Sequence, residues 1–421
     1  MTIRACTCRV RPVFPAPGIL GYAFSLHIFY NDFLIPEDQG ISAAIFPRLR
    51  ADNDMTKPWK QIINAAVGLR QDLHRIPELN WSEVQTSARI RKELTRAEIS
   101  WRPIARTGTI AVLAKGASGR SIALRTDIDA LPLEEETGVA WVSKTHGCMH
   151  ACGHDGHTAT LIAAALWLKQ QEMHLPGPVT LIFQPAEEGG HGALRMIEEG
   201  SIDSVDAIYG WHNWPALPFG QAVCPDGSVM AGNGTFRITV TGKGGHASQP
   251  EMCRDPVAAA SAIVLTLQQI VSRRLPPQQA VVVSVTSFVA PSAETVTPSQ
   301  AVLAGNIRIA DNEMRDIVNN LITQIATDTA PAWGVKADVE IFPRYGATVN
   351  DPDEAERFRQ ILCREFGEEW ENRSIAIPVM ASEDFHSRLS RHDTGRSGLH
   401  GKCLFSRGCR GANGICSPPS L

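Results

Sequence analysis

The sequence of 421 residues lacks three features that would each assign it to a particular class of protein. It has no basic cluster with interleaved aromatic residues, and its net charge is −4 at pH 7, so a nucleic-acid-binding surface is not indicated. It has no apolar run of the roughly 18–20 residues that a membrane span requires. Its 10 cysteines follow no disulfide or zinc-finger spacing, which favours reduced thiols and a cytoplasmic location. The composition, 43% hydrophobic and 20% charged, is that of an ordinary globular protein.

Both ends of the chain differ from the part between them. Residues 1–54 show no sustained helical or alternating period, so we expect a non-native or disordered leader and a natural start at Met55. A signal peptide is the alternative, because arginines precede an apolar patch at 18–30, but His27 interrupts that patch and no convincing cleavage site follows. From 386 to 421 the chain is rich in Gly, Ser and Arg without a strand or helix pattern, which predicts an aberrant, disordered tail.

The part between these ends is predicted to be an α/β catalytic domain, 55–231 and 345–385, interrupted by an inserted unit, 232–344. A helical pattern from 57 to 96 is broken at Ile76-Pro77, and a further helix is rich in Ala and Leu. Short apolar runs between the helical patterns predict buried strands, each ending where polar residues begin. The strands are expected at 110–114, 122–124, 179–183 and 207–210, and the Ala/Leu-rich helix at 158–169.

The inserted unit follows a different order of elements. Its patterns run strand, helix, strand, strand, helix, strand, which is the βαββαβ order of ferredoxin-like units. The predicted ranges are 236–241, 255–274, 280–289, 301–309, 313–329 and 335–342. We expect such an insert to serve as a lid or as a dimerisation surface.

The most informative motif is His150-Ala-Cys152-Gly-His154-Asp-Gly-His157. It places one thiol and three imidazoles within eight residues, a ligand set that suits a transition metal. Cys152 could instead be a thiol nucleophile or a small buried apolar residue. A zinc finger is disfavoured, because no second cysteine pair stands at finger spacing. Since further histidines and a carboxylate pair accompany the motif, a metal site is the favoured interpretation.

That carboxylate pair is Glu187-Glu188, which follows the strand predicted at 179–183. Adjacent side chains on extended backbone point to opposite sides, so one glutamate can bind metal while the other faces an attacking water. A metal can lower the pKa of its bound water from about 15.7 to about 7. A glutamate can then take the proton and pass it to a leaving amine. The alternative interpretation is a solvated acidic turn.

Further polar groups follow predicted strands or a glycine-rich turn. His212 follows the strand at 207–210, and in open α/β sheets ligands gather at such carboxyl ends. Asp127 and Asp129 share a face of the chain, being two residues apart. Asp129 is predicted to fix the tautomer of a metal-bound histidine, whereas Asp127 could simply pair with a neighbouring arginine. His246, in the inserted unit, is the candidate donor to a developing oxyanion, although taken alone it would be an exposed loop residue.

These motifs resemble those of the metallo-aminoacylase and carboxypeptidase family, in the branch of hippurate hydrolase and the plant auxin-conjugate amidohydrolases. The resemblance extends from about Trp59 to Phe385, with the motifs in the family's order. They lie at 127–132, 149–157, 183–190, 210–213, 242–250, 347–351 and 382–385. The resemblance implies an α/β, zinc-exopeptidase-like catalytic domain with a mixed central sheet, and an inserted ferredoxin-like lid and dimerisation domain.

The resemblance also implies a role for each candidate residue. The positions that match ligands of a two-metal centre are Cys152, His154, Glu188 and His212. Glu187 matches the general base. His246 matches a histidine that assists at the substrate carbonyl and that, in relatives, can serve the partner subunit's site.

Two departures from the family pattern stand out. The family expects a fifth metal ligand, a histidine shortly before a proline near the C-terminus, followed by an apolar closing strand and helix. His400 imitates this histidine but comes too early and precedes Gly401-Lys402, so we leave it unassigned, and the closing elements are missing. Thr295 stands where relatives have an asparagine that helps to bind substrate.

The sequence therefore predicts a metal-dependent amidohydrolase that uses two divalent ions, Mn²⁺ or Zn²⁺. Its expected substrates are small, hippurate-like N-acyl amino acids, cleaved to a carboxylate and a free amino acid. We expect a homodimer formed through the inserted domain, with no nucleic-acid or membrane partner. A metallo-exopeptidase or a biosynthetic N-acetyl deacetylase is the alternative enzyme. A catalytically dead metal-binding relative is the alternative of another class, because the C-terminal element is missing.

Overall fold

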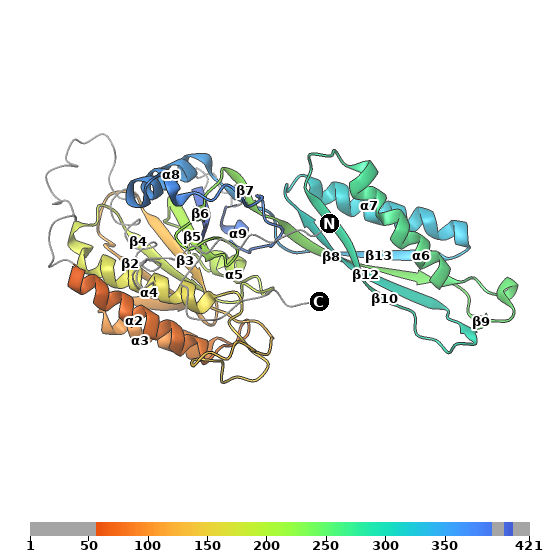
Figure 1. Cartoon of the computed structure of the whole chain (residues 1–421), viewed down its shortest axis with the longest axis horizontal. Helices are drawn as coiled ribbons and strands as arrows, with labels where there is room; N and C mark the ends of the chain where they lie inside the picture. The colour runs from red at the N-terminus through yellow and green to blue at the C-terminus, as the bar shows by residue number, and fades with distance from the viewer. Residues whose placement is uncertain (1–55, 390–399, 407–421) are drawn as a thin grey trace, which may run out of the picture.

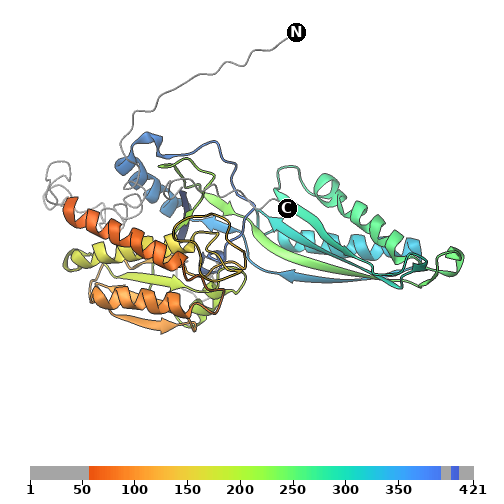
Figure 2. The ribbon, with the colours of Figure 1, turned by 60° about the horizontal axis from the view of Figure 1, so that its bottom comes forward.

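The computed structural model describes residues 56–389 and 400–406, which form a larger and a smaller body (Figure 1, Figure 2). The predicted leader at 1–54 lies outside the described residues, as do 390–399 and 407–421. The chain crosses into the smaller body once and returns once, so the smaller body is an insert in the larger one.

A mixed sheet of seven strands lies at the centre of the larger body. In spatial order its strands are β1 (Trp101–Ile104), β2 (Gly108–Leu113), β4 (Val179–Gln184), β3 (Ile122–Asp127), β5 (Ala207–Asn213), β15 (His400–Ser406) and β6 (Ala222–Val223). The central strands β3, β4 and β5 run parallel, whereas β1 and β2 form an antiparallel edge. Since β3 and β4 are buried along their whole length, their runs of apolar residues belong to a sheet covered on both faces.

Helices cover both faces of this sheet. One face packs against α2 (Thr56–His74), α3 (Val84–Arg96), α4 (His154–Gln170) and α8 (Pro352–Phe366), and the other against α5 (Gly192–Glu198). Strand β4 shows the alternation, because Leu181 and Phe183 lie in the first core and Ile182 lies in the second. The elements α2, α3, α4 and β2 to β5 match those predicted for the catalytic domain, whereas α5, α8, β1, β6 and β15 were not predicted.

Helix α4 begins at His154, four residues earlier than its apolar pattern predicts. Gly153 precedes it with a φ of 96°, a left-handed conformation that glycine adopts without steric cost. The helix is buried on nearly all sides, which explains why its sequence shows no polar face. The candidate metal-binding motif therefore lies at the start of a buried helix.

The smaller body has a sheet in the order β10-β12-β8-β13 with two helices on one face. Its elements are β8 (Gly232–Thr241), α6 (Pro256–Leu267), β10 (Val281–Val289), β12 (Gln300–Ile309), α7 (Met314–Thr329) and β13 (Lys336–Pro343). This is the predicted βαββαβ order, and the body has an apolar core of its own. Helix α6 begins as its sequence indicates, since Asp255 accepts a hydrogen bond from the Val257 N–H at 2.8 Å and Pro256 holds the first turn.

Short pairings complete the fold. At the junction of the two bodies, β7 (Gly227–Met230) pairs with β14 (Thr348–Asn350). Within the insert, β9 (Gly245–His246) pairs with β11 (Val296–Thr297).

The C-terminal segment contains more regular structure than the sequence indicates. The short helix α9 (His386–Leu389) follows the larger body, and β15 pairs in parallel with β5 and antiparallel with β6. The prediction of a tail without secondary structure is therefore wrong for 386–389 and 400–406. A strand edge offers unpaired backbone groups, and a short segment can pair with it without an alternating pattern of its own.

Candidate metal centre and active site

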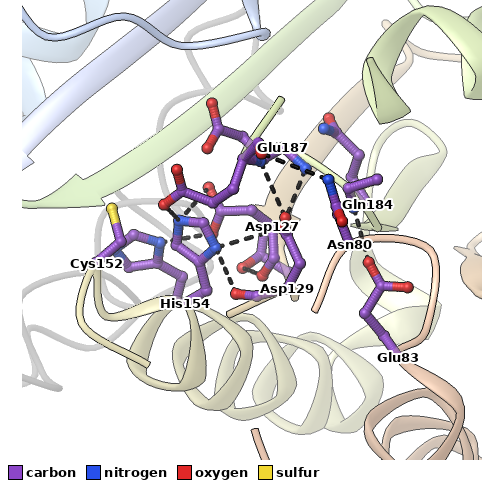
Figure 3. A network of polar contacts seen from close by, with 12 residues as sticks. Asn80, Glu83, Asp127, Asp129, Cys152, His154, Gln184 and Glu187 are labelled. Carbon is purple, nitrogen blue, oxygen red and sulfur yellow. Dashed lines mark hydrogen bonds and ion pairs between the residues drawn. The ribbon is translucent and has the colours of Figure 1, made fainter. Parts of the chain in front are cut away.

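The predicted ligands converge on His154, at the carboxyl ends of the parallel strands (Figure 3). One group joins Cys152, His154 and His212, and a second joins His154, Glu187 and Glu188, each with its ligand atoms within 4.8 Å of one another. The Cys152 Sγ lies 3.4 Å from the His212 Nε2. The two groups meet at His154, whose Nε2 can bind one ion, and together they offer donors for two neighbouring metal ions.

The donor atoms fit such a metal. The His154 side chain is fully buried, its Nδ1 donates to the Asp129 backbone oxygen at 2.8 Å, and its Nε2 has no hydrogen-bond partner among the described residues. That Nε2 lies 4.0 Å from the Glu188 Oε1. Burial lowers the pKa of His154, but Asp127 and Cys152 outweigh it and raise that pKa well above the usual value. These neighbours favour a positive charge at His154. A divalent cation bound at Nε2 would supply that charge in place of a proton.

Cys152 and His212 differ in the protonation state from which each would bind a metal. Burial raises the pKa of the Cys152 thiol to about 11, so in the absence of a cation the thiol stays protonated. Burial, with His157 nearby, lowers the pKa of His212 to about 4, so its imidazole is neutral. A neutral imidazole is ready to bind a metal, whereas the thiol must first lose its proton.

Asp129 connects the histidine to the glutamate pair. Its two carboxylate oxygens accept hydrogen bonds from the Glu187 N–H at 3.1 Å and the Glu188 N–H at 2.9 Å. Its Oδ1 also lies 3.4 Å from the His154 Nδ1. Asp129 thus lies behind His154, where the sequence expects a residue that fixes its tautomer, and it also orients the turn that carries both glutamates.

Glu187 is buried among other acidic groups. Burial, with Glu383, Glu188 and Asp384 close by, raises its pKa well above the usual value. Its Oε1 accepts a hydrogen bond from the Asp384 N–H at 3.2 Å. A carboxylate with this surrounding has a strong affinity for a proton, as a general base requires.

Known proteins resemble this chain over most of its length. The sequence profile of peptidase family M20/M25/M40 matches residues 123–400. This chain belongs to that family. Among curated relatives, the N-acetyl-L-cysteine deacetylase of Bacillus subtilis is 42% identical over 275 residues, which span 65% of this chain and 66% of the relative. The hippurate hydrolase of Campylobacter jejuni is 39% identical, over 75% of this chain and 83% of the relative.

Further members support the same branch of the family. An IAA-amino acid hydrolase of Arabidopsis thaliana is 41% identical, over 77% of this chain and 74% of the relative. A solved Bacillus subtilis structure, described as a dinuclear metal binding peptidase from the M20 family, has a TM-score of 0.71 at 33% identity, over 83% of this chain and 89% of that chain. The predicted family, its amidohydrolase branch, the fold class and the enzyme class, a metal-dependent hydrolase of amide bonds, are confirmed.

The candidate centre also contains residues to which the sequence assigned no role, and His157 is one of them. The His157 Nδ1 donates to the Asp127 Oδ1 at 2.6 Å, and the His157 Nε2 accepts from the Asn213 N–H at 2.9 Å. Since both ring nitrogens are engaged, His157 supports the site rather than binding metal. Its position three residues after His154, on one face of α4, is the signal that could have revealed it.

A buried arginine organises the acidic groups beside the centre. Arg125 forms ion pairs with Asp127 at 2.9 Å, Glu383 at 2.9 Å and Asp384 at 3.0 Å. The Asp127 pairing was one of the sequence's alternatives. Burial raises the pKa of Asp384 to about 7, and Gln184 contributes two further hydrogen bonds to that carboxylate. Glu383 and Asp384 stand in the 382–385 motif, but the sequence assigned them no role, because only the fold brings them to Arg125.

Neither the predicted His246 nor the unassigned His400 is brought to this site. His246 is exposed in β9, at the end of the insert that points away from the larger body (Figure 1). Its Nδ1 contacts the Ser248 hydroxyl at 2.7 Å. His400 pairs with Ala207 at the start of β5, whereas His212 pairs with Phe405 near the end of that strand. Five residues of strand separate the two levels by about 16 Å, so the backbone register places His400 away from the ligands.

Proposed function

We propose that this chain is a dinuclear metal amidohydrolase that cleaves small N-acyl amino acids to a carboxylate and a free amino acid. The observation that carries the proposal is the pair of ligand groups that share His154, with Glu187 beside them. The relatives' names support the substrate class, since they include hydrolases of hippurate and of IAA-amino acids. The named deacetylase of N-acetyl-L-cysteine supports an N-acetyl substrate as the second candidate.

Each residue has a distinct part in the proposed mechanism. The ions would be held by Cys152, His154, Glu188 and His212. When bound, they would polarise the scissile carbonyl and lower the pKa of the attacking water. Glu187 accepts a proton from that water and transfers it to the leaving nitrogen, so that the C–N bond breaks with a neutral amine. Asp129 keeps His154 in the tautomer whose Nε2 faces the ion.

Zn²⁺ is the proposed metal, with Mn²⁺ as the alternative. A thiolate and two imidazoles favour zinc by their softness, although metal supply also decides occupancy in cells. The cysteines of the described residues, which carry no disulfide, support a reducing, cytoplasmic location. No helix within the described ranges is long and apolar enough to span a membrane.

Two arginines near the base support an anionic substrate. The Arg308 Nη1 donates to the Ser382 hydroxyl at 3.1 Å, and Ser382 directly precedes Glu383, which lies close to Glu187. Burial and the nearby charge of Arg344 lower the pKa of Arg308, so a negative group placed between the two cations would be stabilised. The α-carboxylate of an N-acyl amino acid is such a group.

The proposed dimer gives His246 a function. Because this residue lies at the far end of its own insert, it can serve as an oxyanion donor only at the site of a second copy. We therefore propose a homodimer formed through the inserted domain. An H246A variant should lower kcat without changing metal content, and mixing it with a Glu187→Gln variant should restore part of the activity.

The first experiment is a substrate panel. Purified chain is given N-benzoylglycine, N-acetyl amino acids and dipeptides, with Zn²⁺ or Mn²⁺, and with or without chelator. Metal-dependent release of free amino acid from the N-acyl compounds supports the proposal, and preference for dipeptides favours an exopeptidase. A folded chain that binds two ions yet turns over none of these substrates would be the catalytically dead relative.

A further inference from the structure

We propose that Tyr345 is a positioning residue that couples the inserted domain to the general base. Tyr345 lies just after β13, where the chain returns from the insert to the larger body, and its side chain is buried. Its hydroxyl donates to the Glu187 backbone oxygen at 2.7 Å and accepts from the Gly189 N–H at 3.0 Å. This inference rests on the proposed role of Glu187.

The turn that Tyr345 holds is one that needs support. Ala186 and His191 both have positive φ angles, 55° and 56°, which are costly for residues with a Cβ, and Gly189 has a φ of 96°. Such conformations persist only where the surroundings determine them. The Tyr345 hydroxyl bonds inside this turn, and its ring packs edge-on against His191 with centroids 4.9 Å apart.

The same residue is fastened to the insert by its backbone. The Tyr345 backbone N–H donates to the Asn233 Oδ1 at 2.9 Å, and the Asn233 backbone N–H donates to the Tyr345 backbone oxygen at 2.9 Å. Asn233 stands in β8, where the chain enters the insert. Arg315, on helix α7, donates to the backbone oxygens of both residues. A rotation of the insert therefore moves Tyr345, and Tyr345 moves the Glu187 carbonyl.

The contacts separate this effect from metal binding. The N–H groups of Glu187 and Glu188 are held by Asp129, which does not depend on Tyr345. Removing the Tyr345 hydroxyl should leave the Asp129 hydrogen bonds to both glutamate N–H groups in place and loosen the Glu187 carbonyl and the Gly189 N–H. Small displacements of a catalytic group reduce turnover strongly, whereas ground-state binding of the substrate is less affected.

The test is Tyr345→Phe, which removes only the hydroxyl. We expect kcat to fall by about 10- to 100-fold, with KM within about threefold and metal content unchanged. Hydrogen exchange of the 186–191 amides should quicken. The matched control is Tyr209→Phe, since the Tyr209 hydroxyl is also buried but bonds to Glu354 on α8. Tyr209→Phe should leave exchange in the turn unchanged.

A second variant tests the coupling to the insert. Arg315→Met should lower kcat in the same direction, and its effect should be less than additive in combination with Tyr345→Phe, because both act through one residue. Additive effects, an unchanged kcat in Tyr345→Phe, or unchanged exchange in the turn would each overturn the inference. Failure of the wild type to hydrolyse any N-acyl amino acid would count against the proposed function instead, and the exchange measurement would still decide whether Tyr345 holds the turn.

Discussion

Glu187 is the residue on which the proposed chemistry depends most directly. Glu187→Gln keeps an oxygen that can accept the Asp384 N–H, but it cannot take a proton from water. We expect kcat to fall by about 10²–10⁴-fold, with both ions still bound, measured by steady-state kinetics and metal analysis of the same sample. Turnover within tenfold of wild type, with metal present, would show that another group is the base.

Arg125 is a second residue whose loss should have a large effect. It compensates three buried carboxylates, so Arg125→Met would leave Asp127, Glu383 and Asp384 without their cation. We expect the free energy of unfolding to decrease by about 3–5 kcal/mol, measured by denaturant titration. Arg96→Met, which removes an exposed partner of Glu93, is the control and should change it by less than about 1 kcal/mol. Equal effects of the two variants would contradict this account.

At the scale of elements, an ion pair joins the end of α2 to the start of α4. The His74 Nδ1 lies 2.8 Å from the Asp155 Oδ2, with a cation at a helix C-terminus and an anion at a helix N-terminus. Burial lowers the pKa of His74, but Asp155 outweighs it and the pKa is raised from 6.5. The pKa of Asp155 is lowered from 3.8, because Arg70 and His74 outweigh the effect of burial.

These shifts define a pH dependence of stability. The contribution of His74 is complete below its unfolded pKa of 6.5 and is lost as pH rises through the raised folded value, while that of Asp155 is present above 3.8. His74→Gln should therefore destabilise the metal-free chain by about 1.5–3 kcal/mol at pH 6 and by less at pH 9. Thermal melts in chelator at both pH values would measure this. His146→Gln, at an exposed histidine, is the control and should show no such difference.

At the scale of the whole molecule, the two bodies have separate apolar cores. The predicted ligands all lie in the larger body, so a bound ion stabilises that body alone. We expect calorimetry to show two unfolding transitions, one for each body. Zn²⁺ should raise the melting temperature of only one of them, and at a free concentration of 100 times Kd it should increase that body's free energy of unfolding by about 2.7 kcal/mol. If Zn²⁺ shifted both transitions, or only the transition of the inserted body, this expectation would be wrong.

Local chemistry by itself determined the central part of this site. Cys152, His154 and the Glu187-Glu188 pair stand in short motifs, and residue type and spacing make them candidate ligands. The separate role of each residue came from the family resemblance. The βαββαβ order of the insert was also readable, because strand and helix periods are local properties of the chain. The identity of the family followed from the same motifs.

Only the tertiary structure decided which distant groups support these residues. The Asp384 N–H that contacts Glu187 is 197 positions away in the chain. Tyr345, which follows the insert in the chain, contacts the same turn. No local pattern encodes such pairs, because they depend on the order of strands in the sheet and on where the insert returns. The fold likewise placed His246 at the far end of the insert and set the register of β15, since strand pairing joins backbone groups whatever their side chains.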